Sequence, residues 1–558
     1  MLDNLVKLSN KYGVNPDFVL AGGGNTSYKS KSAGLIFVKA SGVSLADIKE
    51  DGFVALERDK LAIMRGKQYC GDYSDAELEA AVLSDLMDAR SQSGEGQGSK
   101  RPSVETLLHD LFPQAYVLHL HPALANGITC AKNGESAARE LFGDDFVWVP
   151  SIKPGYTLSV WCNEAISAYK TKYKKDCEIL ILQNHGIFWA HDDLDTLDNM
   201  VSETMGKIES KLVRKPDFSA RGFEKSNIAE FMPGLRRVYA DKIESEFACA
   251  KFLFNHEIES LVKDRTHFAP VVKPFSPDHI VYYKAEPLFI DAAASSLSDC
   301  FDAFIAEHKY VPKIVAVQGI GCFALGKTKK ECDTAAALFL DAVKIAAYTE
   351  SFGGYLPLSR ELTDFIINWE VESYRQKIAL DGGSAKRLDE KICIVTGSAQ
   401  GFGKGIAELM MEEGANVVIA DINYDGAKAL ADELNSRTGA CKAVALNTDI
   451  TSEESIKAMV YDTVLEFGGI DIFVNNAGIV RAGGLDELSL RDFELVTSVN
   501  YTAYFLCVKY VSQIMKIQHE HNPSAYFDII EINSKSGLAG SNKNFAYAGS
   551  KFGGIGLT

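Results

Sequence analysis

Three histidines in the first half of the chain have the type and spacing of ligands to a catalytic metal ion. His119 and His121 lie two residues apart in the strand-like run AYVLHLHP. Because successive side chains of a strand point to opposite faces, both imidazoles are expected on one face and Leu120 on the other. His185 follows the apolar run EILILQN, where a turn begins. Three neutral imidazoles leave one coordination position open for water or a substrate oxygen, as in catalytic zinc sites.

A carboxylate upstream of these histidines could transfer protons beside the metal. In the segment RPSVE, Ser103 is predicted to be the N-cap of a helix that presents Glu105 in its first turn. A carboxylate next to a Lewis-acidic metal can act as a proton-transferring base. His109 lies one helical turn later, and we expect it to pack or hydrogen-bond locally. An HxH pair alone is more often structural than metal-binding. These residues therefore indicate a metal site only when they are taken together.

The second half contains a glycine-rich turn of the kind that holds a dinucleotide. The run ICIVTGSAQGFGKGIAELM predicts a strand, a tight turn and a helix, in which Gly397, Gly401 and Gly403 let a pyrophosphate approach the helix N-terminus. The next strand, ANVVIAD, ends at Asp421. A carboxylate there accepts hydrogen bonds from an adenosine ribose and repels a 2′-phosphate, which favours NAD over NADP.

The elements that position these residues divide the chain into segments. After the polar run LDGGSAKRLDE, apolar strand-like runs (ICIVTG, NVVIAD, IDIFVNNAG, DIIEINS) alternate with helical stretches, which predicts βαβ units and a doubly wound parallel Rossmann sheet. The Gly/Ser-rich run of residues 91–100 is predicted to be a loop inside a domain. We therefore expect an α/β protein with these segments: 1–240 and 241–380, a linker at 381–390, and a dinucleotide-binding domain at 391–558.

An internal similarity lies within the first 380 residues. The run ILILQNHGIFWAHDDLDTLDNM from Ile179 resembles IVAVQGIGCFALGKTKKECDTA from Ile314, with strand, turn, strand and helix in the same order. Two interpretations are open: a degenerate second copy of the N-terminal unit, or two unrelated segments of similar pattern. In a true repeat, Ile320 occupies the position of His185, so the second copy has lost this ligand and is structural.

Composition limits the function classes. The 558 residues are too many for one compact core, and 46% hydrophobic with 24% charged residues is typical of a globular protein. The net charge of −17 argues against a nucleic-acid partner. The eleven cysteines show no CxxC pairing, and no stretch is apolar enough to span a bilayer, which together favour a reduced, cytoplasmic protein without a membrane partner.

The N-terminal motifs resemble those of class II aldolases of the fuculose/rhamnulose-phosphate aldolase and adducin family. GGGNTSYK, KASG, RPSVE, HLHP and NHG occur in that family's order within about the first 200 residues. The resemblance implies an α/β/α domain in which His119, His121 and His185 bind Zn²⁺ or another divalent metal, and Glu105 is the acid/base. The metal would stabilise the enediolate formed as a carbon–carbon bond breaks. Positions matching the family's phosphate-binding residues are Gly24, Asn25, Ser41, Gly42 and Ser103.

The N-terminal segment departs from these aldolases at two points. Val104 stands where they often have a second serine, which weakens the case for a phosphorylated substrate, and the spacing from Glu105 to His119 is shorter. Retro-aldol cleavage is the leading interpretation. The 4-epimerases of the same family use similar chemistry, and its adducin branch keeps the fold as a non-enzymatic scaffold. The intact glutamate and histidines argue against the scaffold.

The C-terminal motifs resemble those of short-chain dehydrogenases/reductases throughout. TGxxxGxG, the NNAG run and Tyr547-x-x-x-Lys551 follow one another in that family's order. The resemblance implies that Tyr547 is the acid/base, that Lys551 lowers its pKa, that Ser534 holds the substrate oxygen and that Asn500 positions a relay water. The implied cofactor contacts, besides Tyr547 and Lys551, are Gly397, Ser398, Gly401, Phe402, Gly403, Asp421, Asp449, Ile450, Asn476, Ala477 and Gly478. Locally the last residues are similar to sorbitol-6-phosphate dehydrogenases, which indicates a polyol or sugar-derived substrate.

An aldolase segment followed by a dehydrogenase resembles the bifunctional rhamnulose-1-phosphate aldolase/alcohol dehydrogenase family, which NWEVESYR before the linker also fits. The resemblance implies that the first site releases an aldehyde such as lactaldehyde and that the second exchanges a hydride between NAD and that aldehyde or its alcohol. Both families usually assemble, so we expect a homo-oligomer. We also expect this chain to be a fragment whose dehydrogenase site is inactive as given, because KFGGIGLT falls inside the helix of the catalytic tyrosine.

Overall fold

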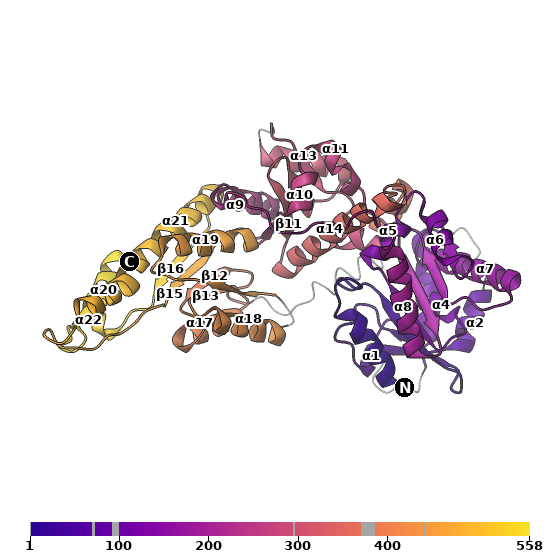
Figure 1. The fold of residues 1–558 in the computed structure, drawn as a ribbon, viewed down its shortest axis with the longest axis horizontal. Coiled ribbons are helices and arrows are strands. Elements are labelled where there is room, and N and C mark those ends of the chain that lie inside the picture. The colour runs from indigo at the N-terminus through magenta and orange to yellow at the C-terminus, as the bar shows by residue number, and fades with distance from the viewer. Residues whose placement is uncertain are drawn as a thin grey trace. The chain divides into compact units, whose positions relative to one another are not determined.

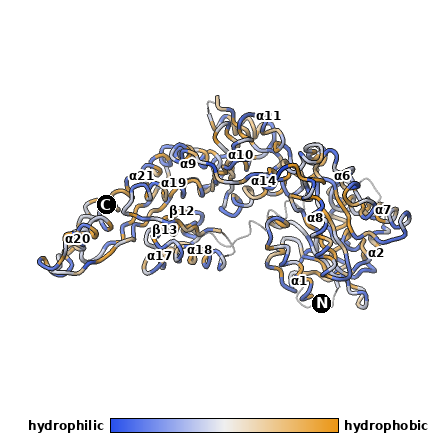
Figure 2. Tube along the Cα trace, viewed as in Figure 1, coloured by the Kyte–Doolittle hydropathy of each residue, from blue (hydrophilic) through white to orange (hydrophobic). Residues whose placement is uncertain are grey.

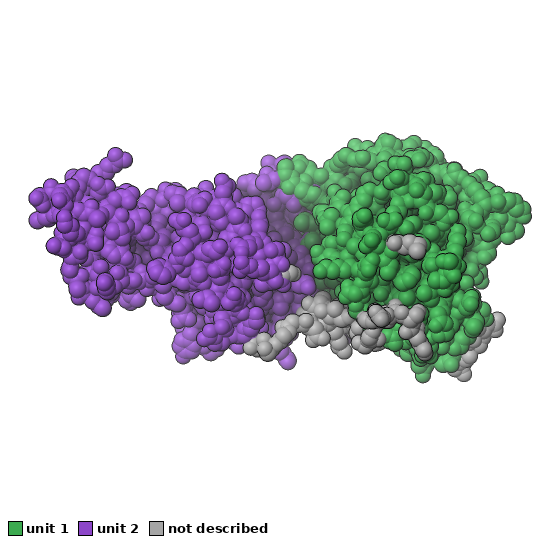
Figure 3. Space-filling view, turned by 90° about the horizontal axis from the view of Figure 1, so that it is seen from below, with its two compact units in different colours: residues 1–219, 263–287, 337–382 green, residues 220–262, 288–336, 383–558 purple. Residues whose placement is uncertain are grey.

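The computed structural model describes residues 2–67, 69, 73–91, 100–293, 296–369, 386–438 and 441–558. These form two compact units, coloured separately in Figure 3. Unit 1 contains residues 1–219, 263–287 and 337–382, and unit 2 contains residues 220–262, 288–336 and 383–558. Residues 92–99 of the expected loop and residues 381–385 of the expected linker lie outside the described residues. Each unit is therefore built from segments that are not contiguous in the sequence.

Unit 1 is built on a seven-stranded sheet of order β3-β2-β1-β4-β7-β6-β5. Its first 200 residues are drawn from indigo to purple in Figure 1. All neighbouring strands are antiparallel except β5 and β6. The strands are β1 (Asn25–Ser30), β2 (Leu35–Lys39), β3 (Phe53–Glu57), β4 (Tyr116–Leu120), β5 (Val147–Val149), β6 (Ile179–Leu182) and β7 (Gly186–His191). The helices are α1 (Leu2–Gly13), α2 (Arg58–Gly66), α3 (Asp75–Asp88), α4 (Thr106–Asp110), α5 (Ala123–Thr129), α6 (Gly134–Phe142), α7 (Tyr156–Tyr173), α8 (Leu194–Glu209), α11 (Arg265–Phe268), α12 (Pro277–Tyr283) and α15 (Arg360–Asn368), with 3₁₀ turns at Glu50–Gly52, Ala269–Val271 and Glu350–Phe352.

Alternation along β4 places helices on both faces of this sheet. Leu118 and Leu120 pack in one apolar cluster with residues of α1, α5, α6 and α8. Val117 points to the other face and packs with residues of α4 and α7. His119 shares the face of Val117, since the side chains of a strand repeat every two residues. The expected α/β/α sandwich is confirmed, and it directs the HxH pair toward α4 and α7.

Unit 2 contains two sheets. The smaller has the order β8-β11-β10-β9, formed by β8 (Cys249–Leu253), β9 (Leu288–Ile290), β10 (Ile314–Val317) and β11 (Gly321–Gly326). Its helices are α9 (Lys225–Lys242), α10 (His256–Leu261), α13 (Leu297–His308) and the first part of α14 (Lys329–Thr349), whose remainder belongs to unit 1. Along the helices, hydrophobic residues alternate with hydrophilic ones (Figure 2), as expected of elements that bury one face.

The larger sheet confirms the predicted Rossmann fold. It is fully parallel, with the order β14-β13-β12-β15-β16. Its strands are β12 (Ile392–Thr396), β13 (Asn416–Asp421), β14 (Ala443–Asn447), β15 (Ile472–Asn475) and β16 (Asp528–Glu531). Its helices are α17 (Gly401–Glu412), α18 (Tyr424–Thr438), α19 (Glu453–Phe467), α20 (Leu490–Thr497), α21 (Ala503–His521) and α22 (Phe545–Leu557), with a π-helical turn η4 (Ser498–Thr502) and a 3₁₀ turn η5 (Lys535–Gly537). Strand order reverses between β12 and β15, the position where such folds bind ligands.

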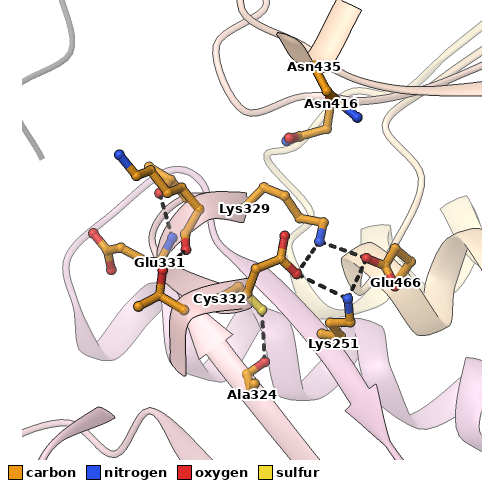
Figure 4. Close-up of polar contacts among 12 residues, drawn as sticks. Lys251, Ala324, Lys329, Glu331, Cys332, Asn416, Asn435 and Glu466 are labelled. Atoms are coloured by element: carbon orange, nitrogen blue, oxygen red, sulfur yellow. Dashed lines mark hydrogen bonds and ion pairs between the residues drawn. The ribbon is translucent and has the colours of Figure 1, made fainter. Parts of the chain in front are cut away.

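A partly buried ion cluster links the smaller sheet of unit 2 to helix α19 (Figure 4). Lys329 at the start of α14 and Lys251 of β8 both contact Asp333 and Glu466, the latter on α19. Burial opposes the charged form of Lys329, but the two carboxylates outweigh it and raise its pKa. Each buried charge is therefore paired, as its desolvation requires.

The two similar sequence runs fold into similar hairpins. β6 and β7 pair antiparallel with Leu182 opposite Gly186, and β10 and β11 pair antiparallel with Val317 opposite Gly321. A helix follows each hairpin, α8 in the first case and α14 in the second. The similarity is therefore real at the level of local structure, while its origin in a repeat stays a prediction. Among the described residues, no helix is long and apolar enough to cross a membrane.

Candidate metal centre and cofactor site

The three predicted histidines and Glu105 converge at the end of β4. Glu105, His119, His121 and His185 each offer one ligand atom, and these atoms lie within 4.8 Å of one another. The Nε2 atoms of His119 and His185 are 3.3 and 3.1 Å from Glu105 Oε1. His119 stacks on Phe188 of the neighbouring strand, with ring centroids 3.8 Å apart. The sheet thus fixes the residues that the sequence singled out.

Hydrogen bonds assign the tautomers of two of these imidazoles. His119 Nδ1 lies 3.1 Å from the carbonyl oxygen of Ile187, and a carbonyl can only accept, so Nδ1 carries the proton. His121 Nδ1 lies 2.6 Å from a carboxylate oxygen of Asp278 and is protonated for the same reason. When both rings are neutral, their two Nε2 atoms face each other as lone pairs, 2.9 Å apart. Lone pairs at this distance, with a carboxylate beside them, fit a shared cation.

Glu105 is buried and held through both carboxylate oxygens. Asn25 Nδ2 donates to Oε2, while Oε1 faces His119 and His185. Burial alone would raise the pKa of Glu105, but the neighbouring His119 and His185 outweigh it and hold the pKa well below its usual range. The carboxyl group is therefore ionised at neutral pH.

The predicted role of Ser103 as N-cap is wrong. Helix α4 begins at Thr106 with Glu105 at the cap position, and the side chain of Ser103 accepts from the backbone N–H of Glu105. A serine hydroxyl can accept a hydrogen bond from the backbone N–H two residues later without being the N-cap of a helix. The sequence does not distinguish these two arrangements, which explains the error. His109 was expected to pack or hydrogen-bond locally. Its Nδ1 atom lies 2.8 Å from Ser27 Oγ, a residue 82 positions away in the sequence.

The predicted phosphate-binding residues lie in three segments: Gly24 and Asn25 at the start of β1, Ser41 and Gly42 after β2, and Ser103 before α4. Gly24 and Gly42 adopt positive φ, 73° and 82°, which favours glycine. A Cβ on Gly24 would lie 3.1 Å from the carbonyl oxygen of His119, so this loop runs directly beside the metal cluster. The backbone N–H of Ser41 donates to Arg101, and the Asn25 amide to Glu105, so both are already engaged.

Three residues from beyond the first 200 positions, which the sequence did not single out individually, also line the pocket beside Glu105. The pocket is walled by residues from the first 200 positions, together with Pro277, Asp278 and Trp369. Trp369 is 5% exposed, and its Nε1 has no hydrogen-bond partner among the residues that the structure describes. No local pattern marked Asp278, because its contact with His121 spans 157 positions.

In unit 2, the predicted glycine turn connects β12 to α17. Gly397 and Gly401 have φ of 62° and 59°. A Cβ on Gly403 would lie 2.3 Å from the carbonyl oxygen of Gly397, so only glycine fits there. Ser398 is buried and donates to Val395, whereas Phe402 is 85% exposed. The turn therefore forms the open cradle at a helix N-terminus that a pyrophosphate requires.

The remaining predicted cofactor residues lie at the carboxyl ends of the parallel strands. Asp421 ends β13 and accepts from the backbone of Ala399 and Asn423. Asp449 follows β14 and accepts from Thr451, next to the buried Ile450. Asn476 donates to Thr396 and Gly397 and so fixes the segment that continues through Ala477 and Gly478. All of these residues follow β12, β13, β14 or β15, the edge where doubly wound sheets bind ligands.

The predicted catalytic residues of this unit lie on η4, η5 and α22, which pack together. Asn500 is fully buried and bonds Ile479 and Ser550. Lys551 donates to the carbonyl oxygen of Ile532 at 2.7 Å, and burial lowers its pKa against the opposing effect of Glu531. Ser534 Oγ accepts from Ser536, and Tyr547 lies on α22 one turn before Lys551.

Comparison with known proteins identifies both halves. The family model "Class II Aldolase and Adducin N-terminal domain" matches residues 3–203, and "Aldolase class II, second domain" matches residues 305–375. The model "short chain dehydrogenase" matches residues 391–558. The chain carries a class II aldolase domain and a short-chain dehydrogenase domain. It is thus an oxidoreductase domain fused to an aldolase-type domain, which implies a nicotinamide cofactor and a divalent metal.

One relative is similar over nearly the whole chain. "Uncharacterized oxidoreductase YuxG" of Bacillus subtilis is 26% identical over 99% of this chain and 82% of its own length. Sorbitol-6-phosphate 2-dehydrogenase of Escherichia coli is 36% identical over 30% of this chain, which spans 63% of that enzyme. The crystal structure of sorbitol-6-phosphate 2-dehydrogenase from Erwinia amylovora is 38% identical, covers 30% of this chain and 63% of its own, and has a TM-score of 0.28.

Proposed function

We propose that this chain is a bifunctional sugar-catabolic enzyme. The aldolase domain cleaves a ketose or ketose phosphate, such as rhamnulose 1-phosphate, by a zinc-dependent retro-aldol reaction. The dehydrogenase domain oxidises or reduces the resulting aldehyde or alcohol with NAD. The observation that carries the proposal is the convergence of Glu105 with three histidines beside a pocket, in a domain of the class II aldolase family.

In the aldolase site, His119, His121 and His185 would hold the cation through Nε2. A bound divalent cation supplies positive charge that polarises a carbonyl and stabilises negative charge developing on oxygen. Glu105, kept ionised by its lowered pKa, accepts the proton of the substrate hydroxyl. Asn25 holds Oε2, so that the proton arrives at Oε1, the oxygen facing the histidines.

The pocket wall favours a second candidate for the substrate. Val104 lines the pocket next to Glu105, where a second serine would otherwise offer a donor to phosphate. An apolar side chain there supports an unphosphorylated ketose or sugar acid, and the same groups support 4-epimerisation. Both alternatives keep the metal and Glu105 in the roles given above.

In the dehydrogenase site, Tyr547 would exchange the proton of the substrate hydroxyl. Lys551, buried beside Ile532, would lower the pKa of the phenol by its charge. Ser534 would hold the substrate oxygen, and Asn500 would position a relay water. NAD rather than NADP is supported by Asp421, because a carboxylate at this strand end repels a 2′-phosphate.

The test is to incubate the zinc-loaded protein with rhamnulose 1-phosphate and with unphosphorylated rhamnulose. Released aldehyde is measured by NADH oxidation through an added aldehyde reductase, and epimers by NMR. Aldehyde supports the aldolase, and epimer without aldehyde supports the epimerase. The loss of both activities in Glu105→Gln, with zinc retained, assigns the proton transfer to this residue. A zinc-loaded protein that yields neither product contradicts the catalytic interpretation. It favours the alternative in which the domain is a non-enzymatic scaffold.

A further inference from the structure

A helix outside the N-terminal aldolase domain reaches the candidate metal centre. The matched domain ends at residue 203, whereas α12 spans Pro277–Tyr283. Asp278, in the first turn of α12, brings Oδ2 within 2.6 Å of His121 Nδ1. Asp278 is 6% exposed, so water screens this interaction little.

The contact decides which nitrogen of His121 is available. A carboxylate accepts the Nδ1 proton, so the neutral ring exposes a lone pair at Nε2, the atom that faces His119 Nε2. A carboxylate behind a ligating imidazole also fixes the ring plane and increases the basicity of the other nitrogen. The Nδ1 atom of His119 instead donates to a backbone carbonyl oxygen, at 3.1 Å.

The position of α12 is fixed independently of any metal. His279, the next residue, accepts from the backbone N–H of Phe275 through Nδ1, and its Nε2 lies 3.2 Å from Asp341. The hydroxyl oxygen of Tyr282 accepts from the backbone N–H of Gly22, in the glycine loop of the same pocket. A Cβ on Gly23 would lie 3.0 Å from Asp278 Oδ2, so a side chain there would crowd the carboxylate.

We infer that Asp278 is a positioning residue of the metal centre, which orients His121 and sets its metal-binding tautomer. The candidate site is therefore completed by a segment that lies outside the N-terminal domain. The inference rests on the metal site of the proposed function, and it concerns binding of the cation rather than any step of the reaction.

The test measures metal affinity in the whole chain by competition with a chromophoric chelator for Zn²⁺, together with the visible absorption of the Co²⁺ form. Asp278→Ala is expected to weaken Zn²⁺ binding by about 10- to 100-fold. Asp278→Asn keeps an acceptor oxygen and should lose less. Asp264→Ala is the matched control, since it removes the carboxylate partner of His267, a half-exposed histidine that is not part of the metal cluster, and should leave affinity unchanged.

The outcomes separate this inference from the proposed function. Zn²⁺ binding by the unaltered chain with weaker binding in Asp278→Ala, at a thermal stability equal to that of Asp264→Ala, supports the inference. Equal Zn²⁺ affinity and an unchanged Co²⁺ spectrum in Asp278→Ala overturn it while leaving the metal site intact. No Zn²⁺ binding by the unaltered chain removes the metal site itself, and with it both proposals.

Discussion

The Nε2 atoms of His119 and His121 lie 2.9 Å apart, although each ring donates its proton in the opposite direction, to Ile187 and Asp278. Two lone pairs held this close repel each other unless a positive charge lies between them. The surrounding hydrogen bonds thus hold two ring nitrogens where a proton or a metal ion relieves the repulsion of their lone pairs.

His119→Ala is expected to abolish tight binding of one divalent cation per chain, because it removes one of three converging imidazoles. Metal content after dialysis, measured by mass spectrometry, checks this. His267→Ala is the control, since that histidine is half-exposed and pairs with Asp264 on the surface. Equal metal content in the two variants would contradict the assignment of His119.

Gly403→Ala and Gly405→Ala form a matched pair on α17. A Cβ on Gly403 meets the carbonyl oxygen of Gly397 at 2.3 Å, whereas a Cβ on Gly405 meets nothing within 4 Å. Gly403→Ala should therefore abolish NAD binding, measured by fluorescence quenching. Gly405→Ala should bind NAD normally and be stabilised by about 0.5–1 kcal/mol, because alanine favours the helix. Normal NAD affinity in Gly403→Ala would show that the cofactor does not use this turn.

Asp421→Ala should reduce the preference for NAD over NADP by about 10- to 100-fold, the range of a lost charge-assisted hydrogen bond. The ratio of dissociation constants, measured by calorimetry, requires no turnover. Asp425→Ala is the control, since Asp425 lies in the first turn of the next helix, α18. An unchanged ratio in Asp421→Ala would remove the basis for choosing NAD.

Glu466→Gln should destabilise the protein at neutral pH by about 3 kcal/mol, because it leaves Lys329 and Lys251 with less compensating charge. Burial raises the pKa of Glu466, but the two lysines outweigh this and lower it below 4.5. A carboxyl with a lowered folded-state pKa stabilises above its unfolded value and loses this contribution as pH falls through the folded value. The difference between wild type and variant, measured by calorimetry, should therefore shrink below about pH 4.5. A difference that grows on acidification contradicts this role.

The Rossmann sheet could be predicted from the sequence because its central strands, β12, β13 and β15, are buried on both faces. ICIVTG and NVVIAD became β12 and β13 nearly residue for residue, since uninterrupted apolar runs followed by glycine have few other interpretations. The shared face of His119 and His121 could be predicted equally well, because strand alternation alone puts both rings on one face.

The rest of the metal centre depends on contacts between distant segments. Asp278 lies in a Ser-Pro-Asp helix start that is common in proteins, and nothing local indicates that it reaches His121. The division into units could not be predicted for the same reason. Segments 263–287 and 337–382 pack with the N-terminal residues through long-range contacts, which composition and periodicity do not encode.

The discontinuous build of unit 1 has a consequence for synthesis on the ribosome. The chain passes between units at residues 219/220, 262/263, 287/288, 336/337 and 382/383. All four members of the metal cluster emerge by residue 185, but the helix that holds His121 in place follows only at Pro277–Tyr283. During translation, the four cluster residues are therefore synthesised before α12, the helix that carries Asp278. A chain truncated before α12 contains the cluster residues but lacks the carboxylate that contacts His121.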